Sequence, residues 1–102
     1  MKIIRLLSDL IEEEQEDACK YARLALQYKE ERPVLAETFY KLSTEEVTHA
    51  NTLHDRVVEI IQEYRKSHGE PPQAMKAVYD YLHEKHVDKA TEIKAKQALY
   101  KA

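Results

Sequence analysis

The sequence predicts an all-α protein that forms a single domain. Its 102 residues include one Gly and three Pro, and 34% of them are Asp, Glu, Lys or Arg. This composition is typical of long helices and is poorly suited to a β fold with many turns. A chain of this length is expected to form one domain around one small core.

Pro33 separates the first two helices. A proline disfavours helical geometry in the residue before it, and its own fixed φ suits the first position of a helix. A tight turn near Glu30 to Arg32 is therefore expected between a helix over about residues 3–30 and a helix over about 33–66. Because this connection is so short, the two helices should be antiparallel neighbours.

A second break lies at residues 67–72, where Gly69 is followed by Pro71 and Pro72. Gly can end a helix, and Pro can begin the next one. A third helix is therefore expected over about residues 72–100.

Each predicted helix carries a stripe of residues spaced alternately three and four apart, which is the pattern of one buried face. The first stripe is Ile3, Leu7, Leu10, Glu14, Asp17 or Ala18, Tyr21, Ala25 and Tyr28. The second is Leu35, Phe39, Leu42, Glu46, His49, Leu53, Val57, Ile60 and Tyr64. The third, which is less regular, is Met75, Tyr79, Leu82, His86, Ala90, Ile93 and Tyr100.

The second helix has an alternative start. Ser43 to Glu46 matches a capping box, in which Glu46 would bond the backbone at a helix N-terminus. The residues before Ser43 are, however, in phase with those after Glu46 along the stripe. A continuous helix is therefore the better interpretation.

Glu14 and Glu46 interrupt otherwise apolar stripes, which points to a metal ion. An ionised carboxylate removed from water costs several kcal/mol, so something must compensate both groups. The nearby basic residues lie off the stripes: Lys20, Arg23, Lys41 and Arg56. Glu46 and His49 are one helical turn apart on one face and can reach the same ion. Carboxylate and imidazole donors without thiolate suit iron or manganese, with zinc as a substitute.

The chain holds half of a known ligand set. Dimetal carboxylate bundles use one Glu from each of two helices and a Glu-x-x-His from each of the other two. Two copies of the helical hairpin related by a twofold axis would supply four carboxylates, which balance two divalent cations. The sequence therefore predicts a homodimer, or a larger homo-oligomer of dimers, that binds two ions per dimer.

The segment over about residues 10–64 resembles the first helix pair of the rubrerythrin branch of the ferritin-like superfamily. The resemblance is carried by Glu14, Tyr21, Phe39 and the run from Glu45 to Ala50. The resemblance implies a ferritin-like domain over residues 1–102 and two iron ions per dimer. It also implies oxidation of Fe(II) with O2 or peroxide, in iron storage or in protection against oxidative stress. The implied metal-binding and catalytic residues are Glu14, Glu46 and His49, with Tyr21 beside them.

The chain also departs from the full-length pattern of that branch. It has a single third helix in place of a second ligand-bearing pair, and so resembles the shorter encapsulated-ferritin-like members, whose site forms between two subunits. It has no rubredoxin-like cysteine module, and an encapsulating shell stays open as a partner. The alternative function is a non-enzymatic helical module for dimerisation or interaction, with a static metal or none.

Other polar residues near the stripes are weaker candidates. Asp17 could orient the His49 ring, although a surface role is favoured. His54 follows His49 by five residues and should turn away from it, so a position on the helix surface is favoured over a second metal-binding role. Asp80, His83 and His86 could complete a site within one chain. Asp80 and His83 are, however, out of phase with His86 on the third stripe, which favours packing or an oligomer contact.

Charge and composition exclude several other classes. Residues 1–70 carry ten basic and fifteen acidic side chains, and residues 71–102 carry six basic and four acidic, so no basic surface for nucleic acid is expected. Arg5 and Asp9 interrupt the N-terminal apolar stretch, which argues against a membrane span or signal peptide and favours a cytoplasmic location. The lone Cys19 allows no internal disulfide and is expected to be a small apolar filler.

Overall fold

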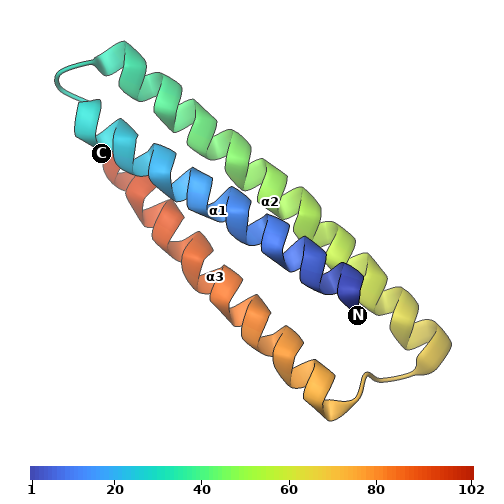
Figure 1. The fold of residues 1–102 in the computed structure, drawn as a ribbon. Coiled ribbons are helices and arrows are strands. Elements are labelled where there is room, and N and C mark those ends of the chain that lie inside the picture. Colours follow the sequence, from blue (N-terminus) through green and yellow to red (C-terminus); the bar gives the residue numbers. More distant parts are fainter.

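The computed structural model describes all 102 residues as three helices, α1 (Lys2–Tyr28), α2 (Pro33–His68) and α3 (Gln73–Lys101). Figure 1 shows α1 and α2 as an antiparallel hairpin, with α3 running beside α1 in the same direction. The all-α prediction is confirmed, and each helix boundary lies within two residues of the predicted one. No helix carries an apolar stretch long enough to cross a bilayer.

The two predicted breaks end the helices as expected. Arg32 leaves helical geometry at φ -136 and ψ 73, and Pro33 opens α2. Gly69 ends α2 at a φ of 77, in the left-handed region that glycine adopts without strain, while its N–H still donates to the Arg65 oxygen.

Small side chains hold α1 and α2 together. The buried residues of α2 are Ala36, Ser43 and Ala50, each seven positions from the next. They face a hairpin partner whose buried positions include Ala18 and Ala25, also seven apart. A seven-residue period keeps one face of each helix against the other over many turns. The two helices therefore stay in contact along their length, and residues in the middle of each come to lie opposite one another.

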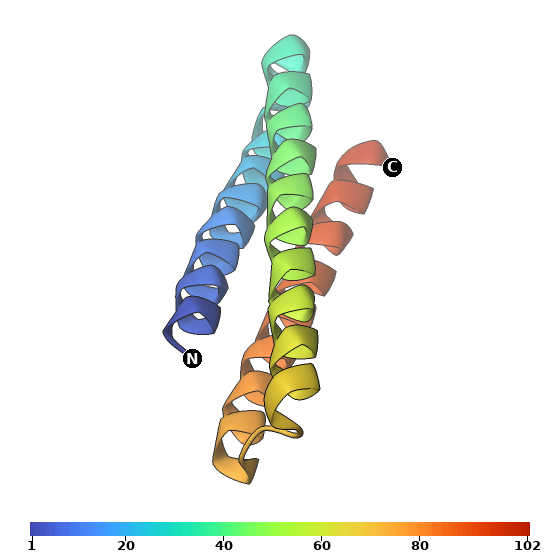
Figure 2. The ribbon, with the colours of Figure 1, turned by 90° about the vertical axis from the view of Figure 1, so that its right-hand side faces the viewer.

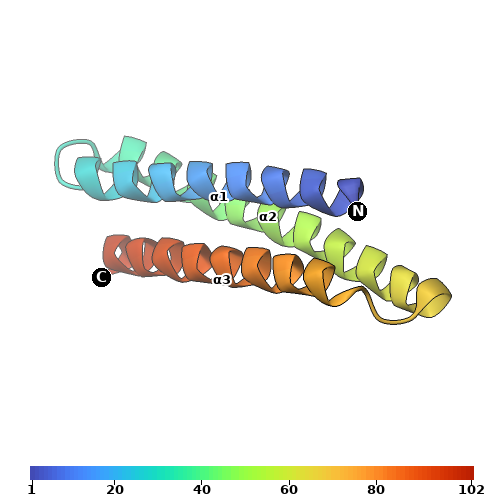
Figure 3. The same cartoon turned by 60° about the horizontal axis from the view of Figure 1, so that its bottom comes forward.

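The third helix packs mainly against α1 and touches α2 much less. Ile93 packs against Ala18, Cys19 and Val47, and Tyr100 packs against Ala25 and Ala36. Figure 2 shows α3 tilted relative to α2, and Figure 3 shows its C-terminal end on the same side of the molecule as the turn between α1 and α2, where the Lys29 ammonium donates to the Tyr100 and Ala102 backbone oxygens. Most of the stripe predicted for this helix therefore faces inward, and Cys19 is the buried apolar filler that the sequence predicted.

Most residues of the stripes predicted for α1 and α2 are not the core of a single chain, although Ala18 and Ala25 of the first stripe are fully buried. The other buried positions of α1 lie one step further along, among them Ile4, Ile11 and Gln15, while Ile3 is 44% exposed. The reason is that α3 covers the side of α1 that carries Gln15 and leaves the other side of the hairpin uncovered. We call this uncovered surface the open face. Its apolar residues are Ile3, Leu7, Leu10, Tyr21 and Tyr28 of α1 and Leu35, Phe39, Leu42, Leu53 and Ile60 of α2.

Ser43 links all three helices. Its hydroxyl donates to the Ala18 backbone oxygen at 2.7 Å and accepts a hydrogen bond from the Gln97 side chain at 2.9 Å. The side chain is fully buried inside a helix that continues without a break. The alternative in which Ser43 caps a helix start is therefore wrong.

Replacing Ser43 with Ala is expected to lower the free energy of unfolding by about 1–3 kcal/mol, because the Gln97 amide then loses its acceptor in a partly buried position. Urea denaturation measures the change. Thr48→Ala is the matched control, since the exposed Thr48 hydroxyl bonds only to the Thr44 oxygen one turn earlier, and its loss should change stability by less than about 0.5 kcal/mol. Equal effects from the two substitutions would contradict the linking role of Ser43.

Candidate metal centre

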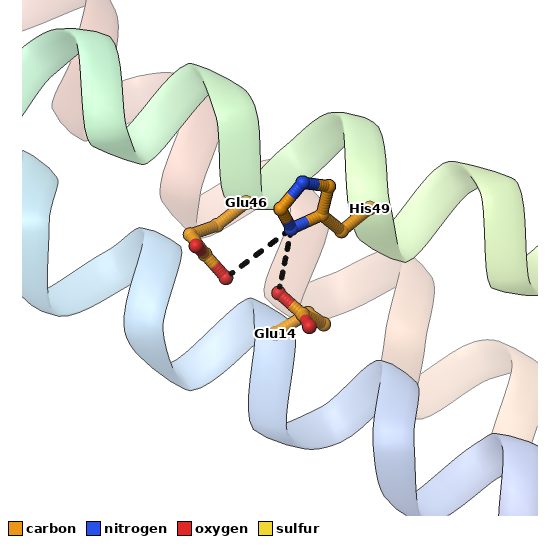
Figure 4. A group of neighbouring side chains, drawn as sticks. All are labelled: Glu14, Glu46 and His49. Atoms are coloured by element: carbon orange, nitrogen blue, oxygen red, sulfur yellow. Dashed lines mark hydrogen bonds and ion pairs between the residues drawn. The ribbon is translucent and has the colours of Figure 1, made fainter.

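Glu14, Glu46 and His49 converge between α1 and α2, as Figure 4 shows. One potential ligand atom from each of the three side chains lies within 4.8 Å of those of the other two. His49 Nδ1 is 3.3 Å from a Glu14 oxygen and 3.8 Å from a Glu46 oxygen. The structure thus brings together the three ligands that the sequence predicted, and it does so within one chain.

The cluster lies in the middle of the open face. Gln15 donates to the His86 backbone oxygen on α3, and Glu14, the preceding residue, points about 100° away from it around the helix. In Figure 4 the ribbon of α3 passes behind the hairpin. The Glu14 and Glu46 side chains are 29% and 19% exposed, and that of His49 is 56% exposed. The carboxylates are therefore partly withdrawn from water, while the cluster stays accessible from the side away from α3.

The Glu14 and Glu46 carboxyl groups lie close together without a Lys or Arg side chain beside them, and this raises the pKa of Glu46. The pKa of Glu46 is raised from 4.5 to about 6, first by its hydrogen bond with Glu14, then by burial and by the Glu14 charge; His49 acts in the opposite direction. Neither carboxylate pairs with a Lys or Arg, and His49 is the partner of both. A proton held between two carboxyl groups occupies the place that a divalent cation can take.

The donors also fit the metal that the sequence predicted. Two carboxylates and one imidazole, without thiolate, suit iron or manganese. Three donors from one chain leave further coordination positions to be filled from outside it, on the accessible side of the cluster. The residues present therefore fit half of a dimetal carboxylate site.

Tyr21 and Asp17, the two residues suggested as neighbours of the site, make no contact with its three candidate ligands that the structure records as a hydrogen bond or ion pair. Tyr21 lies two turns along α1 from Glu14 and stacks on Phe39, with ring centres 6.2 Å apart. No hydrogen bond joins Tyr21 to the three ligands. Asp17 is exposed and pairs with Lys20 at 3.7 Å, so it has the favoured surface role and does not orient His49.

His54, His83 and His86 lie on the side of the hairpin that α3 covers. His54 is half-buried with its ring 5.6 Å from that of His83, so its expected position on the surface is wrong. His86 is half-buried and lies 3.3 Å from the Ser8 hydroxyl. None of them joins Glu14, and the site is not completed within one chain by α3. The sequence singled out His83 through the Asp80-x-x-His83 spacing, but no feature of the sequence indicated its contact with His54.

Comparisons of this chain with protein-family models, with curated proteins and with solved structures found no match. The resemblance to the ferritin-like superfamily therefore stays a prediction from the sequence.

Metal binding at this site is expected to tighten as the pH rises from about 5 to about 7, because the cation must displace the proton held by Glu46, whose pKa is about 6. Below that pKa the apparent affinity for Mn²⁺ should fall about tenfold per pH unit for each proton displaced. Calorimetric titration in buffers of different ionisation enthalpy measures both affinity and proton release. An affinity that is constant over this range would show that Glu46 is not a ligand.

Proposed function

We propose that this chain is a ferritin-like diiron protein that acts as a homodimer. In this proposal, Glu14, Glu46 and His49 of both chains hold two iron ions, which Mn²⁺ or Zn²⁺ can replace, and Fe(II) is oxidised by O2 or peroxide. The biological role would be iron storage or protection against oxidative stress. The observation that supports it best is the convergence of two carboxylates and an imidazole in the middle of an uncovered apolar face.

The open face supports the dimer. A single chain offers three donors, which are too few to complete a dimetal site of the carboxylate type. Apolar residues continue along both helices on either side of the donors, among them Leu10, Leu42 and Leu53, all half-buried in one chain. Packing two such faces about a twofold axis would bury these side chains and place four carboxylates around two divalent cations. The same contact thus covers the apolar surface and balances the charge.

The protein's own residues have three tasks in the proposed reaction. The bound iron supplies the electron transfer, by cycling between the ferrous and ferric states. Glu14 and Glu46 provide negative charge that favours the ferric state and can bind through one oxygen or two. His49 provides a neutral donor, which keeps the total charge of the site low. The apolar residues of the open face would exclude water and other ligands.

The proposal is tested by adding Fe(II) to the metal-free protein in air and following ferric absorbance. Two Fe(II) ions each lose one electron, and one O2 takes up these two electrons and two protons to give H2O2. The protein is expected to accelerate this oxidation at least about tenfold over buffer, an effect smaller than typical enzymatic rate enhancements. Glu45→Gln, at an exposed position next to Glu46, should leave the rate unchanged.

The interaction module gives a different result in the same assay. A chain that dimerises through the open face without accelerating Fe(II) oxidation would contradict the enzymatic proposal and support a structural role. Retention of the rate after His49→Ala would also count against the proposed site.

A further inference from the structure

A partly open cavity of about 280 Å³ is lined by residues of all three helices, on the side of the hairpin that α3 covers. Its walls are apolar where Ile4, Ile11 and Leu82 line it. Three imidazoles also line it, from His54 on α2 and from His83 and His86 on α3, together with Asp80. We call these four residues the histidine cluster.

The His54 and His83 rings lie against each other in the lining of the cavity. Their ring centres are 5.6 Å apart and the rings are tilted by 31°. Two imidazoles bound to one tetrahedral ion, at metal–nitrogen distances of about 2.0–2.1 Å, hold their ring centres about 5 Å apart. Neither ring takes part in a hydrogen bond or an ion pair, so their nitrogen atoms are available to a ligand.

His86 and Asp80 extend the pair along α3. Asp80, His83 and His86 are spaced three residues apart, so each is a neighbour of the next on the helix surface, and all three line the cavity although they do not share one stripe. Asp80 forms no ion pair. His86 is half-buried beside the pair of His54 and His83, with its Nε2 3.3 Å from the Ser8 hydroxyl.

An ion could be held here only after side chains of the histidine cluster turn. In the present positions the donor atoms are further apart than in the Glu14 cluster. Closing them on an ion requires rotation of side chains such as that of His83, which is exposed and therefore free to turn.

We propose that His54, His83 and His86, with Asp80, form a second metal site that is separate from the diiron site. Imidazole-rich sites favour Zn²⁺, Ni²⁺ or Cu²⁺ over the harder cations that carboxylates prefer, so Zn²⁺ is the ion to be expected here. An ion in this place joins α2 to α3, the two helices with the fewest contacts. It would stabilise the half of the bundle near Pro71.

The test uses the double variant Glu14→Gln/Glu46→Gln, which removes the carboxylates of the first site, and Co²⁺ as a spectroscopic substitute for Zn²⁺. This protein is expected to bind one Co²⁺ per chain with the intense visible absorption of a tetrahedral ion. Adding His83→Ala should weaken binding at least about tenfold, since even outer-shell changes cost that much at metal sites. His68→Ala is the matched control, because His68 stacks on Tyr64 at the end of α2 and does not line the cavity.

Thermal unfolding provides an independent measurement. Zn²⁺ should raise the unfolding temperature of the double variant and of its His68→Ala form, but not of its His83→Ala form. Because His83 is exposed, its replacement should leave the metal-free fold intact, which circular dichroism checks. Binding that survives His83→Ala, or that is lost equally in His68→Ala, would overturn the second site. Neither result bears on Fe(II) oxidation, because the first site has been removed.

Discussion

Replacing Glu46 with Gln is expected to reduce Fe(II) oxidation to the rate in buffer while making the metal-free protein more stable. The amide cannot supply the negative charge that a bound cation needs. In the metal-free chain, however, the hydrogen bond with Glu14, burial and the Glu14 charge all favour the protonated form of Glu46, which is why its pKa rises from 4.5 to about 6. A shift of that size corresponds to about 2 kcal/mol, so the stability of the variant at pH 7 should increase by up to that amount.

The pH dependence of this gain has a defined sign. A raised carboxyl pKa contributes stability that is present below the unfolded value of 4.5 and is lost as the pH rises through about 6. The advantage of Glu46→Gln over the parent chain should therefore vanish near pH 4 and be complete near pH 7. Urea denaturation of the metal-free proteins at both pH values measures it. The exposed Glu45→Gln serves as control, and a loss of stability in Glu46→Gln at pH 7 would contradict the repulsion between the two carboxylates.

Replacing Leu35 with Asp is expected to break the proposed homodimer and, with it, the proposed retention of metal. Leu35 is 41% exposed on the open face and lies eleven residues before Glu46, about 16 Å along the helix. A charge at this position does not touch the ligands and is tolerated in a single chain. Burying it in a dimer contact costs several kcal/mol, which weakens self-association at least about a hundredfold. Analytical ultracentrifugation and iron content after gel filtration measure the two effects.

Val87→Asp is the matched control for this substitution. Val87 is an exposed apolar residue of similar size on α3, and it does not belong to the open face. The control should therefore keep the dimer and its iron. If Leu35→Asp leaves both unchanged, or if both substitutions dissociate the dimer equally, the open face is not the surface through which the chains associate.

The sequence predicted the local features because each depends on neighbouring residues. Pro33 and Gly69 end helices through their own backbone preferences. The helix through Ser43 followed from a stripe that stays in phase on both sides of it. Glu14, Glu46 and His49 stood out because they interrupt apolar stripes near the middle of two helices that a short turn makes antiparallel. The geometry brings these three together within one chain.

The packing of α3 could not be predicted, because its stripe fits either side of the hairpin. The sequence placed the core on the stripe that contains Glu14, whereas α3 lies on the side of Gln15. That choice depends on long-range contacts such as Gln97 with Ser43 and Ile93 with Ala18. The contact between His54 and His83 depends on the same packing and was missed for the same reason. The uncovered Glu14 stripe is what a surface for a second chain requires.

The proposed function requires two chains to share one pair of iron ions on their open faces. Anomalous scattering at the iron absorption edge, from crystals grown with Fe(II), would locate these ions. We expect two iron peaks for each pair of chains, between the two hairpins and bound by Glu14, Glu46 and His49 of each. Iron bound elsewhere, or chains whose open faces do not meet, would contradict it.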